Sequence, residues 1–131
     1  MIGLDANVIV RYLAQDDVVQ SLKATQLIES LSKETPGFIA MVSIVELIWV
    51  MQGCYKATKV ECVSILKALL QTQTIIIENT DIVIKTLQIY SNANADFADC
   101  LIKRCANQAK CSCVMTFDIN AAKNANMLMI D

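Results

Sequence analysis

Histidine is absent from this chain of 131 residues, and proline and glycine are scarce, with one and three residues respectively. Without histidine, and with no C-x-x-C pair among its six cysteines, the chain lacks the usual ligands of a zinc site. The scarcity of proline and glycine leaves no flexible linker and no mark of a domain boundary. We therefore expect a single domain over residues 1–131, a typical length for one domain.

Long apolar runs and an excess of positive charge are missing as well. No run approaches the roughly 20 residues that a membrane-spanning helix needs, and the N-terminal "MIGLDANVIV" has no basic stretch before an apolar core. These features predict a cytoplasmic protein without membrane contact, whose cysteines are reduced. The net charge of −2 argues against a surface coated in positive potential for duplex DNA, but leaves room for a local basic rim.

Apolar residues are abundant by contrast. They make up 55% of the chain, against 18% charged residues, which is slightly more apolar than an average soluble domain. This surplus predicts that some apolar surface is hidden against a partner or a second subunit, and hence an oligomer.

Five short apolar runs recur along the chain. They are "MIGL" at 1–4, "FIAMV" at 38–42, "TIII" at 74–77, "CVMTF" at 113–117 and "MLMI" at 127–130. None alternates with polar residues, which is typical of strands buried on both faces. Segments with the helical spacing of apolar residues lie between the runs, at 24–31, 62–69 and 98–105. The pattern predicts an α/β fold, a three-layer α/β/α sandwich with a central parallel sheet of about five strands.

Acidic residues follow three of the predicted strands. Asp5 comes directly after the first, Glu46 ends the "SIVE" that follows the second, and Asp118 follows the fourth. Asp96 and Asp99 open the helical segment that leads into the fourth strand. Because the carboxyl ends of parallel strands meet at one edge of a sheet, where ligands bind in such folds, we expect these carboxylates to converge there.

Each acid also has a structural explanation. Asp5 and Asp118 can cap the helices that follow them, which is worth about 1 kcal/mol for each cap. Ser43 and Glu46 fit a capping box, and "DFAD" at 96–99 has the same spacing. Helix capping does not account for all of the acids together. Glu46 lies within the apolar "SIVELIWVM", where an unpaired carboxylate is costly to bury.

Several carboxylates at one sheet edge need a counter-charge. Two of them ~4 Å apart repel by roughly 4 kcal/mol at an effective dielectric constant of about 20. No lysine or arginine immediately follows any predicted strand, so a divalent cation is the simplest source of positive charge. Oxygen ligands without histidine favour Mg²⁺ or Mn²⁺, which keeps positions open for phosphate oxygens. The chemistry predicted is phosphoryl transfer or phosphodiester hydrolysis.

Four segments carry a family resemblance through their order and spacing. They are "LDANVIVRYL" at 4–13, "VSIVELIWVM" at 42–51, "ADFADCLI" at 95–102 and "VMTFDINAAK" at 114–123. Together they resemble the four acidic motifs of the PIN-domain ribonucleases, and in particular the VapC-type toxins of bacterial toxin–antitoxin pairs. The resemblance covers essentially the whole chain.

This resemblance implies a Mg²⁺- or Mn²⁺-dependent endoribonuclease. The catalytic metal ligands that it implies are Asp5, Glu46, Asp99 and Asp118. Asp96 would be either a further ligand or a helix cap. The resemblance also implies an RNA substrate, a homodimer and a cognate antitoxin protein that blocks the acidic cleft.

Supporting residues are implied as well. Asn7 would order the site by hydrogen bonding, and Thr116 would do likewise. Position 6 departs from the pattern, since Ala6 stands where many relatives carry a small hydroxyl residue. One supporting hydrogen bond is therefore expected to be missing.

Three other functions deserve comparison with the ribonuclease. A haloacid-dehalogenase-like phosphatase would need a second aspartate where Asn7 stands, together with a catalytic lysine. A receiver domain would need an acidic pair after the first strand and a lysine after the last, whereas "MLMI" leads to no lysine. A catalytically inactive PIN-like interaction module is the remaining alternative, and the intact acids argue against it.

Overall fold

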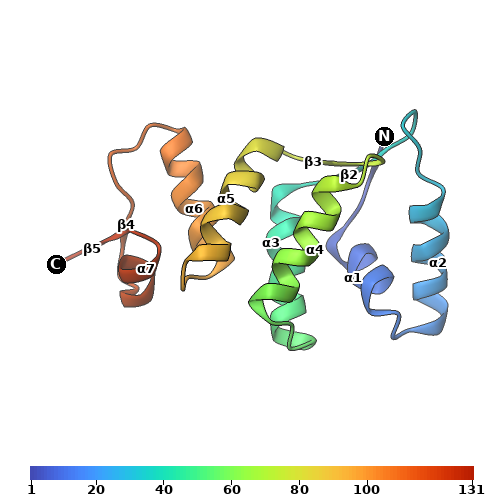
Figure 1. The fold of residues 1–131 in the computed structure, drawn as a ribbon, viewed down its shortest axis with the longest axis horizontal. Coiled ribbons are helices and arrows are strands. Elements are labelled where there is room, and N and C mark those ends of the chain that lie inside the picture. The colour runs from blue at the N-terminus through green and yellow to red at the C-terminus, as the bar shows by residue number, and fades with distance from the viewer. The chain divides into compact units, whose positions relative to one another are not determined.

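The computed structural model describes all 131 residues and contains seven α-helices and five short β-strands. The chain divides into two compact units, Met1–Thr80 and Asp81–Asp131 (Figure 1). The expectation of a single domain over residues 1–131 stays a prediction. None of the helices is both long and apolar enough to cross a membrane.

The first unit holds a parallel sheet of three strands and four helices. The strands are β1 (Ile2–Gly3), β2 (Gly37–Ile39) and β3 (Ile75–Ile77), and the helices are α1 (Ala6–Ala14), α2 (Val18–Glu29), α3 (Met41–Cys54) and α4 (Lys59–Gln71). Strand β2 lies in the centre and pairs in parallel with β1 on one side and β3 on the other. Helices connect the successive strands, as parallel pairing requires.

Helix α1 packs against both α2 and α3 and so lies at the centre of this unit. The residues of the core that are at most 1% exposed include Ile9, Ile39, Ile44, Leu47 and Leu66. They come from α1, β2, α3 and α4, so a single apolar core fixes the two helices that begin just after β1 and β2.

Gly37 begins β2 at a point where there is no room for a side chain. A Cβ atom at this position would lie 2.8 Å from Leu4 Cδ1 and 2.9 Å from Leu31 Cδ1. Leu31 was predicted to continue a helical face, but α2 ends at Glu29 and Leu31 is buried just beyond it. Close packing of these two leucines over the start of β2 therefore explains the glycine.

The second unit holds two parallel strands and three helices. Its elements are α5 (Thr80–Asn92), which begins at the boundary residue, α6 (Phe97–Gln108), β4 (Met115–Thr116), α7 (Ile119–Asn124) and β5 (Leu128–Met129). Tyr90 and Phe97 form its aromatic centre, with ring centroids 5.4 Å apart in an edge-to-face arrangement. The buried Thr86 is satisfied locally, because its hydroxyl donates to the Ile82 carbonyl at 2.7 Å.

The parallel α/β class predicted from the sequence is confirmed, but the extent of the sheet is not. Every apolar run overlaps a strand, yet β1, β2 and β3 form one sheet while β4 and β5 pair with each other in a second. The prediction of one central sheet of about five strands is wrong, because apolar runs locate strands without specifying their partners. The three-layer arrangement stays a prediction.

The predicted burial of the strands on both faces is correct only near the centre of the first sheet. Gly37 and Ile39 of β2 are buried, whereas both residues of β1 and both of β5 are exposed. Exposed fractions are 36% for Ile2 and 54% for Leu128. These short strands lie at sheet edges, where apolar side chains are left partly open.

Candidate metal centre

Asp5 lies between the end of β1 and the start of α1, as the sequence predicted. It is the N-cap of α1, and its Oδ1 accepts a hydrogen bond of 2.7 Å from the Ala6 amide. The Leu4 amide donates to the Phe38 carbonyl at 2.8 Å, which fixes the chain just before Asp5 to strand β2. The cap uses one carboxylate oxygen, so the other is available to a cation. Asn7 is exposed, and its predicted ordering role stays a prediction.

Glu46 does not take part in the predicted capping box. Helix α3 begins at Met41, so Ser43 is a buried residue of its first turn and Glu46 lies well inside the helix. The N-cap position is held by Ala40, which has no side chain to cap with. Glu78, just after β3, replaces it, because its Oε1 accepts a hydrogen bond of 2.9 Å from the Met41 amide. The true cap comes from 37 residues away, beyond any local pattern.

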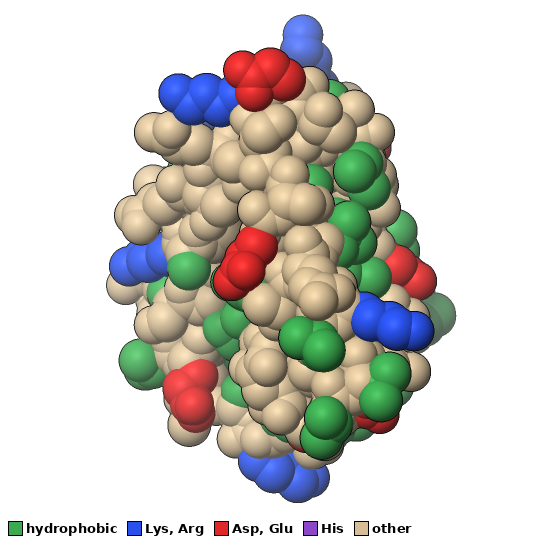
Figure 2. All heavy atoms as spheres, turned by 90° about the vertical axis from the view of Figure 1, so that its right-hand side faces the viewer, with side chains coloured by type: hydrophobic (Ala, Val, Ile, Leu, Met, Phe, Trp, Pro, Cys, Tyr) green, Lys and Arg blue, Asp and Glu red, His purple; other side chains and the backbone are tan.

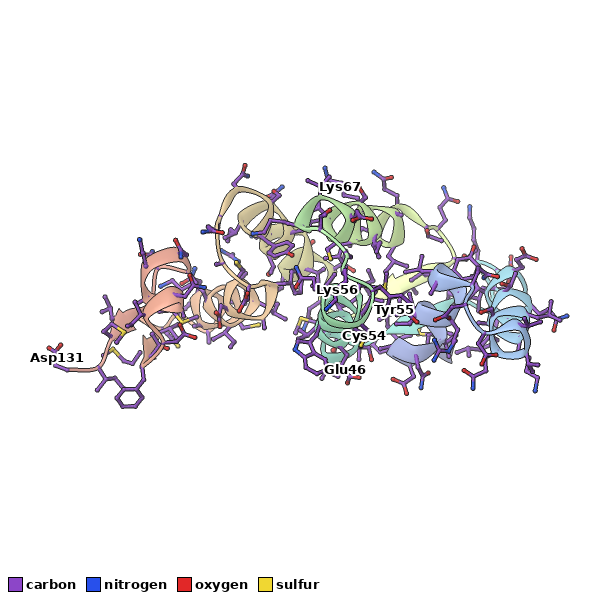
Figure 3. The ribbon with its side chains drawn as sticks, turned by 90° about the horizontal axis from the view of Figure 1, so that it is seen from below. Glu46, Cys54, Tyr55, Lys56, Lys67 and Asp131 are labelled. Carbon is purple, nitrogen blue, oxygen red and sulfur yellow. The ribbon has the colours of Figure 1, made fainter.

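The expectation that the Glu46 carboxylate is buried is also wrong. Helix α3 buries Ile44 and Leu47 on one face, while Glu46 is exposed together with Val42 and Trp49, which are 64% and 76% exposed. Figure 3 shows Glu46 on the outward side of the helix. Because both faces of α3 are apolar, the sequence alone could not tell them apart. Glu46 therefore needs no counter-charge to be stable, and it is accessible to a cation from solvent.

A polar network that sequence reasoning missed joins α1 to the end of α3. Arg11 Nη1 donates to Tyr55 Oη at 3.0 Å and to Asp16 Oδ1 at 3.2 Å, and Tyr55 Oη donates to Asp16 Oδ2 at 2.6 Å. Arg11 Nε donates to Gln20 Oε1 at 2.8 Å. Figure 3 shows Tyr55 just beyond α3, close to α1. The network braces the helix that Asp5 begins against the helix that carries Glu46.

The network has clear effects on the pKa values of its members. The hydrogen bond with Tyr55 raises the pKa of Arg11 above its ordinary value, with smaller help from the charge of Asp16. The hydrogen bond from the same hydroxyl lowers the pKa of Asp16. Donating to a carboxylate raises the pKa of the Tyr55 phenol, so that the hydroxyl keeps its proton. All three groups therefore hold the protonation states that the network needs.

The second unit contains the other three predicted ligands. Asp96 is the N-cap residue of α6, but its side chain makes no capping hydrogen bond. Asp99 lies in the first turn of the same helix, and Asp118 is the N-cap of α7, as predicted. Asp118 Oδ1 accepts hydrogen bonds from the amides of Asn120 at 2.8 Å and Ala121 at 3.1 Å.

Thr116 has a defined contact that fits its predicted supporting role. Its Oγ1 accepts a hydrogen bond of 3.0 Å from the Asp118 amide. The residue at the end of β4 thus fixes the backbone from which the Asp118 carboxylate projects. Whether this ordering serves a metal stays a prediction.

Asp99 is the acid whose surroundings disfavour a negative charge most clearly. Partial burial raises its pKa above the ordinary aspartate value, and the carboxylates of Asp96 and Asp118 raise it further. Asp96 and Asp118 are therefore each close enough to act on Asp99 through space. An all-carboxylate set of this kind has the chemistry that Mg²⁺ or Mn²⁺ prefers.

The acids are distributed over both units. Asp5 and Glu46 belong to the first unit, and Asp96, Asp99 and Asp118 belong to the second. Within either unit, no three histidine, cysteine, aspartate or glutamate side chains lie close enough together to hold a metal ion. The donor chemistry of these acids therefore fits a hard cation.

Comparison with known families gives the class of the protein. The PIN domain family model matches residues 2–126, which is nearly all of the 131 residues. The chain therefore belongs to the PIN-domain family, a family of nucleases. No curated protein gives a significant match to the chain.

Proposed function

We propose that this protein is a Mg²⁺- or Mn²⁺-dependent endoribonuclease that acts as the toxin of a type II toxin–antitoxin pair. The family match supports the nuclease class. The observation that supports the metal-dependent part is the surroundings of Asp99, where partial burial, and then the neighbouring carboxylates of Asp96 and Asp118, raise its pKa. A bound cation would relieve this repulsion.

Four acids would hold the ion, namely Asp5, Glu46, Asp99 and Asp118, with Asp96 as a further ligand. The metal, when bound, would polarise the scissile phosphate and provide a hydroxide at neutral pH. Asp5 and Asp118 each accept a hydrogen bond from a backbone amide, which holds their carboxylates at the starts of α1 and α7. Rigid placement of this kind limits the freedom that the ligands lose when an ion binds.

An antitoxin and a second copy of the chain are the proposed protein partners. Large apolar side chains are exposed in both units. Examples are Val18 at 87%, Trp49 and Phe117 at 76%, and Val60 and Ile119 at 75%. Exposed apolar surface of this extent supports contact with other proteins. The six cysteines form no disulfide, which fits the proposed cytoplasmic location.

The inactive-module and phosphatase alternatives receive no specific support. All of the acids required for the nuclease are present, and Asn7 stands where a phosphatase of the haloacid-dehalogenase type needs an aspartate. An interaction module alone would have no use for the group of three carboxylates around Asp99.

The direct test is cleavage of RNA by the purified protein with and without metal. We expect cleavage with Mn²⁺ or Mg²⁺, none in excess EDTA, and a loss of at least about 100-fold in rate for Asp5→Asn, because one metal ligand loses its charge. Asp81→Asn is the matched control, since Asp81 is an exposed acid in the first turn of α5 outside the proposed ligand set. Unchanged cleavage by Asp5→Asn or in EDTA would contradict the metal mechanism.

A further inference from the structure

A groove lies between α1 and α2 in the first unit. Its volume is about 510 Å³, and its polar lining comes from Asn7 and Arg11 of α1 and from Gln20 and Lys23 of α2. The rest of the lining is apolar, from Val8, Ala24 and Leu27, and no lining residue is acidic. The two cationic and two amide side chains form a polar edge that suits an anion with several oxygen atoms.

Arg11 is held in this groove with part of its guanidinium unused. Its Nε donates to Gln20, and the two N–H groups of Nη1 donate to Asp16 and Tyr55. Arginine has five N–H donors, so both N–H groups of Nη2 are left without a protein partner. The three bonds keep the side chain in place, which lowers the entropy that it would lose on binding an anion.

Lys23 carries a positive charge in the groove that no ion pair offsets, unlike that of Arg11. Asp16 forms an ion pair with Arg11 and offsets its charge. The ammonium of Lys23 is exposed, and no carboxylate lies within ion-pair distance of it. Asp17 also acts on Arg11 through its charge. Lys23 is therefore the cation of the groove whose charge no ion pair offsets.

The position of the groove relates it to the candidate metal centre. Asn7 lines it and is only two residues from Asp5, the N-cap of α1. Asn7 and Arg11 are four residues apart, a rise of about 6 Å along the helix. A ligand along the groove would thus run from Asp5 toward the far end of α1.

We propose that this groove binds the sugar–phosphate backbone of the RNA substrate, with Lys23 and Arg11 Nη2 on phosphate oxygens. The inference rests on the proposed ribonuclease function and adds the path of the substrate. Nucleic-acid backbones are held by lysine, arginine and amide side chains of this kind. Figure 2 shows the side of the first unit that α2 covers, where basic and acidic side chains are interspersed over the surface. Binding would therefore depend on the individual contacts of Lys23 and Arg11, because the surface around them has no uniform positive charge.

The test measures RNA binding without cleavage. A fluorescein-labelled single-stranded RNA of mixed sequence is titrated with the full-length protein in EDTA, at several salt concentrations, by fluorescence anisotropy. Losing one phosphate contact lowers the salt slope of a single strand by about 0.7, which corresponds to about fivefold weaker binding at ~0.1 M salt. We expect this result for Lys23→Gln and a larger loss for Lys23→Glu.

Lys67→Gln is the matched control. Lys67 is an exposed lysine of α4 in the same unit, outside the groove (Figure 3). We expect it to bind RNA as the wild type does, and circular dichroism will confirm that all variants are folded. The proposal is overturned if both Lys23 variants bind normally, if Lys67→Gln loses as much affinity, or if the wild type binds no RNA in EDTA.

The two proposals fail in different ways. Metal-dependent cleavage that Asp5→Asn abolishes, combined with normal RNA binding by the Lys23 variants, would leave the nuclease standing and refute the groove. Lys23-dependent binding without any cleavage would refute the nuclease and leave the groove as a binding site for RNA.

Discussion

The hydroxyl of Tyr55 donates a hydrogen bond of 2.6 Å to Asp16 Oδ2 and so joins the residue after α3 to the segment that follows α1. Arg11 completes the link by donating to both partners. This contact fixes two helices that carry proposed metal ligands, and it does so at the opposite end of α1 from Asp5.

We expect Tyr55→Phe to lower the free energy of unfolding at pH 7, because the hydrogen bonds of the hydroxyl are lost. The pKa of Asp16 is depressed in the folded protein, so its contribution is present above the unfolded-state value of 3.8 and is lost as the pH falls through the folded value. The difference between variant and wild type should therefore shrink in acid. Urea denaturation at pH 7 and at about pH 3 measures both effects.

Tyr12→Phe is the matched control for this prediction. Tyr12 is a partly exposed tyrosine of the same unit whose hydroxyl takes no part in the network. Its substitution should change the stability by less than about 0.5 kcal/mol. An equal loss in both tyrosine variants would refute the bracing role of Tyr55.

Gly37→Ala tests the close packing at the start of β2. The added methyl group would lie within 3 Å of Leu4 and Leu31 side-chain atoms, so we expect a loss of about 1–3 kcal/mol in stability. Gly3→Ala is the control, because a Cβ at Gly3 meets nothing within 4 Å. Thermal unfolding of the two variants should separate them clearly. Similar melting temperatures would show that the leucines move aside.

Asp99→Asn should stabilise the metal-free protein at neutral pH. The folded-state pKa of Asp99 is raised above 3.8, so the charged form destabilises the fold, and stability from this group declines as the pH rises through the folded value. The variant removes that penalty, and its advantage should vanish below about pH 3.8 in denaturation experiments without metal.

The same substitution should abolish metal-dependent cleavage if Asp99 is a ligand. A gain in stability together with a loss of activity is the signature of a functional residue that the fold tolerates at a cost. Asp131→Asn, at the exposed end of the chain, serves as the control in both assays. A destabilised Asp99→Asn at pH 7 would contradict the cost assigned to burying the Asp99 charge beside two other carboxylates.

Local patterns predicted the features that depend on neighbouring residues. The caps at Asp5 and Asp118 were predictable because each acts within three residues of its own position. The predicted box at Ser43 failed because Glu78, which follows β3, caps α3. Likewise, Arg11 and Tyr55 are 44 residues apart, and only the fold brings them together.

In the candidate site too, local features could be predicted from the sequence, and features that depend on distant contacts could not. The order of the acids along the chain and the residue types of the ligand set could be derived from the sequence, as could their positions near helix starts. The exposure of Glu46 could not, because both faces of α3 are apolar and packing against α1 and α4 determines which is covered. The strand pairing also depends on contacts between distant segments, and short apolar runs do not encode it.

Trp49 is the only tryptophan of the chain, and it lies one turn from Glu46 on the exposed face of α3 with 76% of its surface open to water. Its emission should therefore resemble that of an indole in solution and report on this face of the helix without any label. Burial of the ring by an arriving molecule would shift the emission to shorter wavelengths. The protein thus contains its own optical sensor beside a proposed metal ligand.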